Sequence, residues 1–425
     1  MVKYILTIPE PEQVLNPSQC NVFDRIVRAI ESAEIRGILG PPGTGKTRLL
    51  AYLALHCSLN EGLAVTVTAG MNEAVDQCLR EIVKLIGLKE AKMLVRRCGY
   101  RGRVSPDILP FFSNRRWDLE SARIILTTEK STYRLKEVTK PDVILLDETA
   151  QLQPEQGWYV LRNLFDFNSL NQAVITSGDP RQADPISPRP DKGILRLLME
   201  KYPHKIDYLK ITHRLPTPIC ELDRDVFYPE GLSPWPAIKW RRLSLSKTPK
   251  GPLSDVVDPN NPIVFYNFKG EEMRFGLESW YNPAEAKEVV RLCEAFINSG
   301  VSQEEVLVVT RYIGQENEIR YLLNLQGLDQ VRIMTTTRAL GQEADVVIFS
   351  VVRSNRERLI GASGNPEAIN VAISRARCKL VIVGDFETFA GGWVYLPTEN
   401  RWGRKSVSRK IARLIITKYG YIHNL

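Results

Sequence analysis

Residues 40–47 bring together three glycines, a lysine and two threonines, and they match the pattern G-x-x-x-x-G-K-[ST]. In order they are Gly40, Pro41, Pro42, Gly43, Thr44, Gly45, Lys46 and Thr47, and Arg48 follows. A loop of this type between a strand and a helix directs backbone N–H groups and the positive end of the helix at phosphate oxygens. Lys46 would then reach the outer phosphates of a nucleotide, and the Thr47 hydroxyl would bind Mg²⁺. The pattern predicts a nucleotide site; the alternative is a glycine-rich turn that only closes a βα unit.

Two adjacent carboxylates, Asp147 and Glu148, follow directly on the apolar run 143–146. The run is typical of a buried strand, so both acids are expected at the carboxyl edge of a sheet, where the glycine-rich loop also lies. We expect Asp147 to hold Mg²⁺ and Glu148 to polarise an attacking water molecule. An acidic pair after a strand can also serve only as the cap of the next helix. The sequence lacks the Asn-Lys-x-Asp motif of guanine recognition, which argues against a GTPase.

A polar stretch, residues 178–182, follows the next apolar run and is expected at the same edge of the sheet. Its last residue, Gln182, could sense the γ-phosphate of a nucleotide and orient the attacking water. The alternative is a polar turn in which Pro180 ends the strand. The stretch on its own does not distinguish these two interpretations.

Apolar runs in both halves of the chain alternate with helical patterns. In the first half the runs are residues 36–39, 63–69, 123–127, 143–146 and 173–176, with a helix predicted over 72–86. In the second half they are residues 263–266, 306–309, 331–334, 346–349 and 380–383, with a helix predicted over 284–297. Strands that are apolar on both faces and alternate with helices indicate parallel sheets covered on both sides. The predicted fold class is α/β, with two doubly wound parallel-sheet lobes of which the first carries the phosphate loop.

The composition is typical of a soluble protein, with 425 residues, 44% of them hydrophobic and 25% charged. No apolar stretch approaches the length of a membrane span, and the N-terminus becomes polar too soon for a signal peptide. Seven cysteines lie far apart without a C-x-x-C pair, which argues against zinc ribbons, iron–sulfur clusters and a disulfide framework. We therefore expect a cytoplasmic protein without membrane contact. The net charge of +8 favours polyanionic partners only weakly.

Beyond these features, the chain resembles a superfamily 1 helicase of subclass B, in the branch that includes the nonsense-mediated-decay helicase and senataxin. The resemblance covers residues 16–385 and depends on motifs that occur in the order of the family. In the first half, the matching stretches are residues 16–19 (Q motif), 69–76 (motif Ia), 147–151 (motif II) and 178–185 (motif III). In the second half, they are residues 213–215, 309–315 (motif IV), 335–345 (motif V) and 370–377 (motif VI). Motif VI, Asn-Val-Ala-Ile-Ser-Arg-Ala-Arg, is the most specific of them after the phosphate loop.

The resemblance implies two RecA-like lobes that use ATP and Mg²⁺, with the accessory barrel of relatives reduced or absent because the gap between motifs is short. By this resemblance Gln19 reads the adenine, Arg214 contacts the γ-phosphate and Arg375 is the arginine finger. An arginine from the opposite lobe stabilises the transition state only when the lobes close, which ties ATP hydrolysis to closure of the cleft. The alternative for Arg375 is an ordinary surface cation. The remaining nucleotide-binding positions by resemblance are His213, which replaces an aromatic residue stacked on the base, Gly341 and Glu343.

The implied function is that of an ATP-dependent helicase or translocase on single-stranded RNA or DNA, moving 5′-to-3′. The implied contacts to the strand are Asn72, Thr127, Thr310, Arg311 and Thr335, although hydroxyls after strands are also common helix caps. Two other classes stay open. One is an ATP-driven switch that binds a protein and does not translocate, or a nucleic-acid-stimulated ATPase that remodels protein–nucleic acid complexes without unwinding. The other is a nucleic-acid-binding module whose site does not hydrolyse ATP. We expect a monomer, and the sequence indicates no particular protein partner.

A segment between motifs Ia and II interleaves cations with aromatic residues. Its members are Arg96, Arg97, Tyr100, Arg101, Arg103, Phe111, Phe112, Arg115, Arg116 and Trp117. The segment either contacts a strand, as a partial substitute for the accessory barrel, or is a solvated loop whose aromatic residues pack on the core. The predicted domains are a first lobe over 1–230, a connection over 231–262, a second lobe over 263–390 and a basic extension over 391–425.

Overall fold

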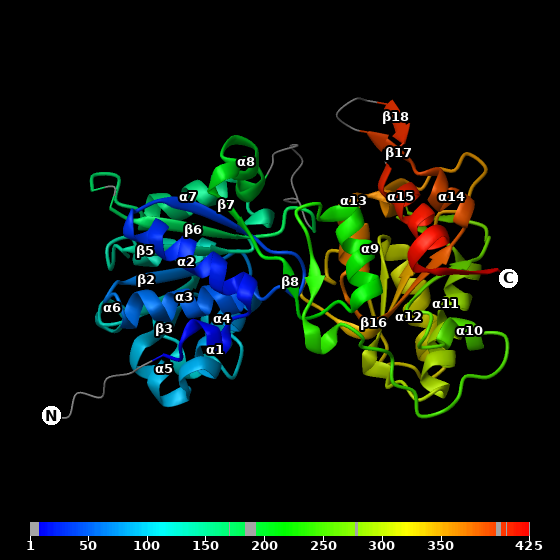
Figure 1. Ribbon diagram of the computed structural model, residues 1–425, viewed down its shortest axis with the longest axis horizontal. Helices are drawn as coiled ribbons and strands as arrows, with labels where there is room; N and C mark the ends of the chain where they lie inside the picture. The colour runs from blue at the N-terminus through cyan, green and yellow to red at the C-terminus, as the bar shows by residue number, and fades with distance from the viewer. Residues whose placement is uncertain are drawn as a thin grey trace. The chain divides into compact units, whose positions relative to one another are not determined.

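The structure, a computed structural model, describes residues 8–169, 171–182, 193–276, 279–396, 401–404 and 406–424. These residues fall into two compact units. Unit 1 contains residues 8–180 and 193–211, and unit 2 contains residues 181–182 and those from 212 onward. Figure 1 labels the helices and strands of both units.

Unit 1 is built on seven strands in the order β3-β4-β2-β5-β6-β1-β7. They are β1 (Ile35–Leu39), β2 (Val65–Ala69), β3 (Val95–Cys98), β4 (Ile124–Thr128), β5 (Val143–Asp147), β6 (Ala173–Gly178) and β7 (Ile206–Tyr208). All of the pairings between these strands are parallel, so the predicted parallel sheet is confirmed. The two edge strands, β3 and β7, are not among the predicted runs, because both are short.

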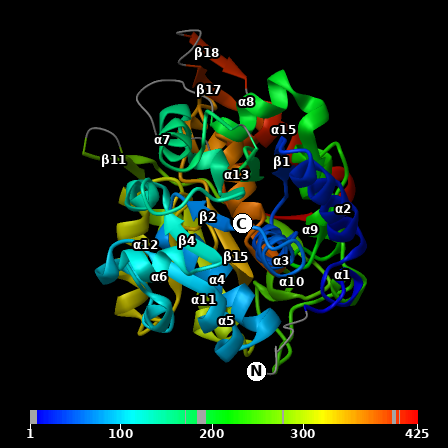
Figure 2. The ribbon, with the colours of Figure 1, turned by 90° about the vertical axis from the view of Figure 1, so that its left-hand side faces the viewer.

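Helices cover both faces of this sheet (Figures 1 and 2). They are α1 (Pro11–Val14), α2 (Pro17–Glu31), α3 (Lys46–Leu59), α4 (Asn72–Ile86), α5 (Leu88–Leu94), α6 (Arg116–Glu120), α7 (Pro154–Leu164) and α8 (Ile194–Lys201). Five 3-10 turns are η1 (Arg101–Arg103), η2 (Leu109–Phe111), η3 (Glu129–Leu135), η4 (Thr149–Gln151) and η5 (Pro203–Lys205). The helix predicted over 72–86 is confirmed as α4.

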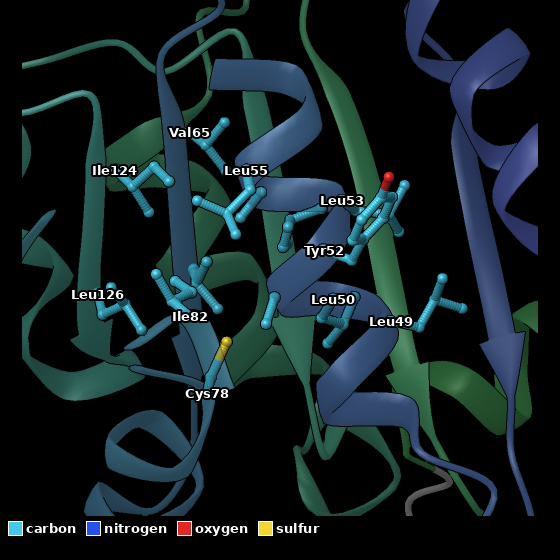
Figure 3. Packing of buried hydrophobic residues seen from close by; sticks show 14 of the residues in the cluster. Leu49, Leu50, Tyr52, Leu53, Leu55, Val65, Cys78, Ile82, Ile124 and Leu126 are labelled. Atoms are coloured by element: carbon cyan, nitrogen blue, oxygen red, sulfur yellow. The ribbon is translucent and has the colours of Figure 1, made fainter. Parts of the chain in front are cut away.

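The core of unit 1 explains why its strands are apolar on both faces. Figure 3 shows side chains of α3 packed against α4 and the strands β2 and β4. On β5, Val143 and Leu145 belong to this core, whereas Ile144 and Leu146 belong to a second core that includes Val160 of α7. Successive side chains of a strand point to opposite faces, so a sheet with helices on both sides favours apolar residues at most positions.

Unit 2 is built on six strands in the order β14-β13-β15-β16-β10-β19, and all of their pairings are parallel. They are β10 (Ile263–Asn267), β13 (Val306–Thr310), β14 (Arg332–Thr335), β15 (Ala344–Ser350), β16 (Ala376–Gly384) and β19 (Tyr421–Asn424). Smaller two-stranded pairs are β8 (Ile211–Thr212) with β9 (Ser233–Pro234), β11 (Met273–Phe275) with β12 (Ser279–Tyr281), and β17 (Trp393–Leu396) with β18 (Arg401–Arg404). The two sheets with their helices are those of two RecA-like lobes, as predicted.

The helices of unit 2 also cover both faces of their sheet. They are α9 (Thr217–Phe227), α10 (Ser254–Val257), α11 (Pro283–Asn298), α12 (Ile313–Leu325), α13 (Pro366–Ile373), α14 (Phe386–Gly391) and α15 (Ser406–Leu414). Shorter turns are η6 (Pro236–Ile238), η7 (Gln303–Glu305) and η8 (Gly361–Gly364), and a π-helix, η10 (Ile415–Tyr419), follows α15. Across the described part of the chain, no helix combines the length and apolar character that crossing a bilayer requires.

The units divide the chain at positions other than the predicted domain boundaries. Helix α9, which we expected in the first lobe, contributes Ile219 and Leu222 to the same core as Phe265 of β10. The expected connection, residues 231–262, also packs in unit 2, where Val256 is part of a core. The expected basic extension, residues 391–425, contributes the buried Ile411 to unit 2. The Pro-rich composition from 229 to 259 indicated irregular chain, but the membership of each segment in a core decides the boundary, which lies at 211/212.

No strand forms in the insertion between β3 and β4, all of whose residues are described. Residues 99–123 fold into η1, η2 and α6 with the loops between them, so this part of unit 1 contains no barrel. Phe111 is 2% exposed and Phe112 packs against the same core. For these two residues, the interpretation as core aromatics is the one that the structure supports.

Lys379 of β16 is a fully buried charged residue in the sheet of unit 2. Its amine donates to the carbonyl of Asp258 at 2.9 Å and to the carbonyl of Asn261. Burial lowers the pKa of Lys379 from 10.5 to about 7. Below pH 7 the amine is charged in both the folded and the unfolded chain, and the folded state carries the full cost of burying the charge. Between pH 7 and 10.5 only the unfolded chain keeps the proton, so stability rises with pH across this window.

We expect this rise to disappear in Lys379→Met. Between pH 7 and 9, the free energy of unfolding of the wild type should increase by about 2 kcal/mol relative to that of the variant. Urea unfolding of both proteins at several pH values measures the difference. The comparison with the variant removes the contributions of other titrating groups, and a difference that does not change with pH would contradict the prediction.

Candidate active site

The loop 40–45 joins β1 to α3, so the predicted strand–loop–helix arrangement is confirmed. Gly43 and Gly45 have φ angles of +70° and +76°, in the left-handed region that favours glycine. A Cβ atom added at Gly45 would lie 2.4 Å from Nε2 of Gln19, and one added at Gly40 would lie 2.5 Å from Cγ of Lys46. Helix α3 begins at Lys46, and the first N–H groups of a helix have no partner within it. The loop thus has the geometry of an anion site at a helix N-terminus.

Gln19 of α2 stabilises the loop through hydrogen bonds to its backbone. Its side chain is 2% exposed, and Nε2 donates to the carbonyls of Thr44 at 3.0 Å and of Gly45 at 3.2 Å. Its Oε1 accepts from the backbone N–H of Asn16 at 2.8 Å. Both ends of the amide are therefore engaged with backbone, and the predicted reading of adenine by Gln19 stays a prediction.

The two cations of the motif have different surroundings. Lys46 folds back over the loop, and Nζ donates to the carbonyl of Gly40 at 2.8 Å. This contact holds the amine beside the loop, where the outer phosphates are expected. Arg48 points elsewhere, since its Nε donates to the carbonyl of Val14 at 2.9 Å, and its predicted contact with the nucleotide stays a prediction.

Thr47, Asp147 and Glu148 meet at the carboxyl end of β5. The Thr47 hydroxyl donates to Oδ2 of Asp147 at 3.2 Å, and the N–H of Glu148 donates to Oδ1 at 2.9 Å. Burial, together with the charge of Glu148, raises the pKa of Asp147 to about 6. Glu148 itself adopts a φ of +52°, which is uncommon for a residue with a side chain. Backbone strain of this kind is concentrated at functional sites.

The residues of this site fit ATP with Mg²⁺. The hydroxyl of Thr47 and the buried carboxylate of Asp147 are oxygen ligands, which Mg²⁺ prefers, and the N–H groups at the start of α3 suit phosphate oxygens. When bound, the metal would neutralise charge on the phosphates. Glu148 is half-buried beside them, and its carboxylate could accept a proton from water.

A methyl group at Gly45 should disrupt the loop. In Gly45→Ala the residue would have to keep a φ of +76° and would collide with the Gln19 amide, so we expect nucleotide affinity to fall at least about 10-fold. Gly62→Ala is the matched control, because Gly62 has a φ of +73° but nothing lies within 4 Å of an added Cβ. Titration with a fluorescent ATP analogue compares the two. Equal affinity in both variants would contradict this role of the loop.

A second cluster of predicted residues lies within unit 2. Arg214 forms an ion pair with Glu343 at 2.6 Å and also donates to the carbonyl of Ser374 at 3.1 Å. Burial acts to raise the pKa of Glu343, but the charges of Arg214, Arg377 and Arg375 outweigh it and lower that pKa. The structure thus brings Arg214 and Glu343, 129 residues apart in the sequence, into contact.

Arg375 is 1% exposed and belongs to the same cluster. Its Nη2 donates to Oε1 of Gln182 at 2.7 Å and to the Ser374 hydroxyl at 2.9 Å, and its Nε donates to the carbonyl of Val371 at 3.1 Å. The alternative of an ordinary surface cation is therefore wrong for Arg375. Its neighbour Arg377 is more exposed and pairs with carboxylates of the same unit.

The stretch after β6 passes from unit 1 to unit 2 between Pro180 and Arg181. Arg181 is held in unit 2 by both carboxylate oxygens of Glu230, at 2.8 and 2.5 Å, and its carbonyl accepts from Asn370 at 3.0 Å. The side chain of Asn370 also donates to the Tyr228 hydroxyl at 2.9 Å. Residues 183–185 of motif III lie outside the described residues.

Sequence reasoning did not find the residues that organise these clusters. Ser374 links Arg214 to Arg375, and Glu230 and Asn370 anchor Arg181. Ser374 and Asn370 belong to motif VI and could have been considered there. Glu230 carried no signal, because it lies between the motifs.

The residues predicted to contact a strand are largely buried. Thr127 and Thr310 are 0% exposed, and Thr335 is 8% exposed. Asn72, at the start of α4, accepts from Nη2 of the buried Arg97 at 2.8 Å. Arg311 is half-buried. The three threonines lie at or next to the carboxyl ends of β4, β13 and β14. The two fully buried hydroxyls have little access to a nucleic-acid strand on the surface, and all five contacts stay predictions.

Two further predicted residues belong to unit 2. His213 is exposed, and its ring lies 5.2 Å from the ring of Trp235, centroid to centroid. Gly341 has a φ of +79°, which explains glycine at this position. The structure itself does not connect either residue with a nucleotide, so both assignments stay predictions.

Comparison with known proteins connects these motifs to a family. Two family models, each described as an AAA domain, match residues 14–216 and 191–387. The chain is 25% identical over 435 residues to the DNA replication ATP-dependent helicase/nuclease DNA2 of Saccharomyces cerevisiae. It is 27% identical over 400 residues to the RNA helicase Mov10l1 of Mus musculus, and 27% identical over 428 residues to a regulator of nonsense transcripts 1 homolog of Arabidopsis thaliana. Over most of its length, the chain is thus similar to superfamily 1 helicases.

The alignments with these helicases cover most of this chain but less than half of the length of each relative. The three relatives are matched over 92%, 84% and 87% of this chain and over 27%, 33% and 32% of their own length. The chain thus spans about a third of the length of these curated relatives. A solved complex of an arterivirus nonstructural protein 10 helicase with DNA aligns with 84% of this chain and 62% of its own, with a TM-score of 0.47 and 16% identity.

Proposed function

We propose that this protein is an ATP-dependent helicase or translocase that moves 5′-to-3′ along single-stranded nucleic acid. Similarity to superfamily 1 helicases supports the class of activity, and the direction follows the family branch that the motifs resemble. Relatives named as DNA and RNA helicases are both similar to this chain, so the proposal includes both kinds of strand.

The observation that supports hydrolysis most directly is the arrangement of Thr47, Asp147 and Glu148. The hydroxyl and the buried carboxylate are within 3.2 Å of each other, and Glu148 follows in a strained conformation. In our proposal, Thr47 and Asp147 hold Mg²⁺, Lys46 binds the outer phosphates and Glu148 orients and deprotonates the attacking water.

We further propose that Arg214 and Arg375 act on the same ATP when the two units close upon it. The motif match suggests this role, and the contact of Arg375 with Gln182 supports it, since both residues are predicted γ-phosphate partners. Hydrolysis would then depend on closure, and repeated closure and opening would move the units along a strand.

The test is ATP hydrolysis with and without matched single-stranded RNA and DNA, followed by unwinding of duplexes with 5′ or 3′ single-stranded tails. We expect stimulation by at least one strand and unwinding of the 5′-tailed duplex. A rate of ATP hydrolysis that is the same with and without each strand would favour an ATP-driven protein switch. Stimulation without unwinding or movement would favour remodelling of protein–nucleic acid complexes. Absence of hydrolysis in all conditions would overturn the proposal.

A further inference from the structure

Three loops lie together at the carboxyl edge of unit 1, beyond the phosphate loop. The strands β3, β4 and β2 are neighbours in the sheet, so the segments that follow them emerge side by side. A Cβ added at Gly99, after β3, would lie 3.4 Å from the Ser131 hydroxyl, after β4. Arg97, near the end of β3, bonds to Asn72, after β2. These contacts connect the three loops into one surface.

The loop after β3 is held at both ends. Asn114 bonds to both the N–H and the carbonyl of Gly99, at 3.0 and 2.9 Å. The N–H of Ser105 donates to the buried carboxylate of Asp76 at 2.9 Å. Between these anchors, Tyr100, Arg101 and Arg103 are exposed. The side chains in the middle of the loop are therefore presented from a backbone that is fixed on each side.

The arginines of this region fall into two groups. Four are paired with carboxylates: Arg80 with Asp107 and Glu73, Arg96 with Asp118, Arg97 with Asp76, and Arg116 with Glu120. Four others, Arg101, Arg103, Arg115 and Arg134, are exposed and have no ion-pair partner among the described residues. Paired arginines have their charge balanced locally, so the unpaired ones determine what the surface attracts.

Exposed aromatic rings accompany the unpaired arginines. Tyr100 is 67% exposed and Tyr133, on η3 after β4, is 51% exposed. The guanidinium of Arg134 lies 5.1 Å from the centre of the Tyr133 ring. Tyr133 and Arg134 follow Ser131 on η3, and a Cβ added at Gly99, after β3, would lie 3.4 Å from the Ser131 hydroxyl. The rings and the cations thus share one region.

We propose that Tyr100, Arg101, Arg103, Tyr133 and Arg134, the Tyr100 surface, bind single-stranded nucleic acid. The arginines contact the phosphates, and the two tyrosines stack on bases. A single strand fits better than a duplex, because only unpaired bases offer their faces to a tyrosine ring. The inference rests on the proposed function and adds to it a contact outside the helicase motifs.

Two double variants test the surface. Arg101→Ala/Arg134→Ala removes two phosphate contacts, and Tyr100→Ala/Tyr133→Ala removes both stacking rings. Arg28→Ala/Lys84→Ala is the charge-matched control, since both residues lie in the last turns of α2 and α4, which lead to the opposite edge of the sheet. Tyr202→Ala, 50% exposed after α8, controls for loss of an exposed ring.

Fluorescence anisotropy with labelled 20-nucleotide oligo(dT) and oligo(U), at several salt concentrations, measures binding. Each phosphate contact to a single strand contributes about 0.7 to the slope of log affinity against log salt. For the arginine variant, which loses two contacts, we therefore expect this slope to become shallower by about 1.4. For the tyrosine variant, we expect affinity to fall about 10-fold or more with little change in that slope. Hydrolysis of ATP without a strand should equal that of the wild type, and thermal unfolding should match that of the controls.

The outcomes separate this inference from the proposed function. In one outcome, a strand stimulates ATP hydrolysis by the wild type while the test variants bind the strand as tightly as the controls do. The inference about the Tyr100 surface is then wrong, and the proposed function is unaffected. If the wild type neither binds nor responds to any strand, both fail. If a test variant unfolds at a lower temperature and binds normally per folded molecule, the side chains are structural and the inference is overturned.

Discussion

Glu148→Gln should lower strand-stimulated ATP hydrolysis about 100-fold to 10,000-fold, which is the usual contribution of a general base. The amide keeps the shape of the side chain but cannot take a proton from the attacking water. Asp147 and Thr47 stay in place, so ATP affinity should change little. A phosphate-release assay measures turnover, and titration with a fluorescent ATP analogue measures binding.

Two comparisons make this prediction specific. Glu155→Gln, on the exposed first turn of α7, removes the same charge from the helix that follows the acidic pair and should leave turnover unchanged. Lys46→Ala should reduce both ATP affinity and turnover, because the lysine is proposed to bind phosphates before and during hydrolysis. Wild-type turnover in purified Glu148→Gln would overturn the assignment of the site.

Arg375→Lys should have a comparably large effect on turnover and a small effect on strand binding. An arginine finger is worth about 1,000-fold to 100,000-fold in rate, and lysine lacks the planar fork that contacts two oxygens at once. We expect turnover to fall at least about 100-fold, with strand affinity within about 2-fold of the wild type. The measurements are strand-stimulated phosphate release and anisotropy of a labelled oligonucleotide.

The burial of Arg375 requires a stability control. Its guanidinium donates to Gln182, Ser374 and the carbonyl of Val371, so lysine will lose some of these bonds. Thermal unfolding therefore accompanies the assay. Arg377→Lys is the matched control, since Arg377 lies two residues further along the chain, in β16, and pairs with Glu305 and Asp345. A parallel loss of stability, strand binding and turnover in Arg375→Lys would mean that the arginine is structural.

The local part of the active site was predictable from the sequence. The glycines of the loop and the acids after β5 are set by short-range geometry: a φ of +76° at Gly45 and a strand that ends at Asp147. Apolar runs predicted the central strands for the same reason, because most positions of a strand buried on both faces are apolar. The short strands β3, β7 and β19 were not predicted, since each has charged or polar residues among its three or four positions and so leaves little apolar pattern.

Burial and pairing across the sequence were not predictable. Arg97 and Arg101 have similar neighbours in the sequence, yet Arg97 is 0% exposed against Asp76, 21 residues earlier, whereas Arg101 is exposed on a loop. Gln182 looked like part of the first lobe, but its contact with Arg375 belongs to unit 2. A sequence pattern shows which groups can ionise, but it does not show which carboxylate will be nearby.

The sequence alone therefore determined the phosphate loop, the acidic pair, the α/β class and the resemblance to helicases. Each depends on residues close together in the chain, where backbone geometry limits the possible arrangements. The tertiary structure decided the boundary at 211/212, the burial of Arg375 with Gln182, and which arginines of the insertion are free to bind an anion. These features depend on how strands distant in sequence pair within a sheet, and that pairing alone brings an arginine to its carboxylate or leaves it in solvent.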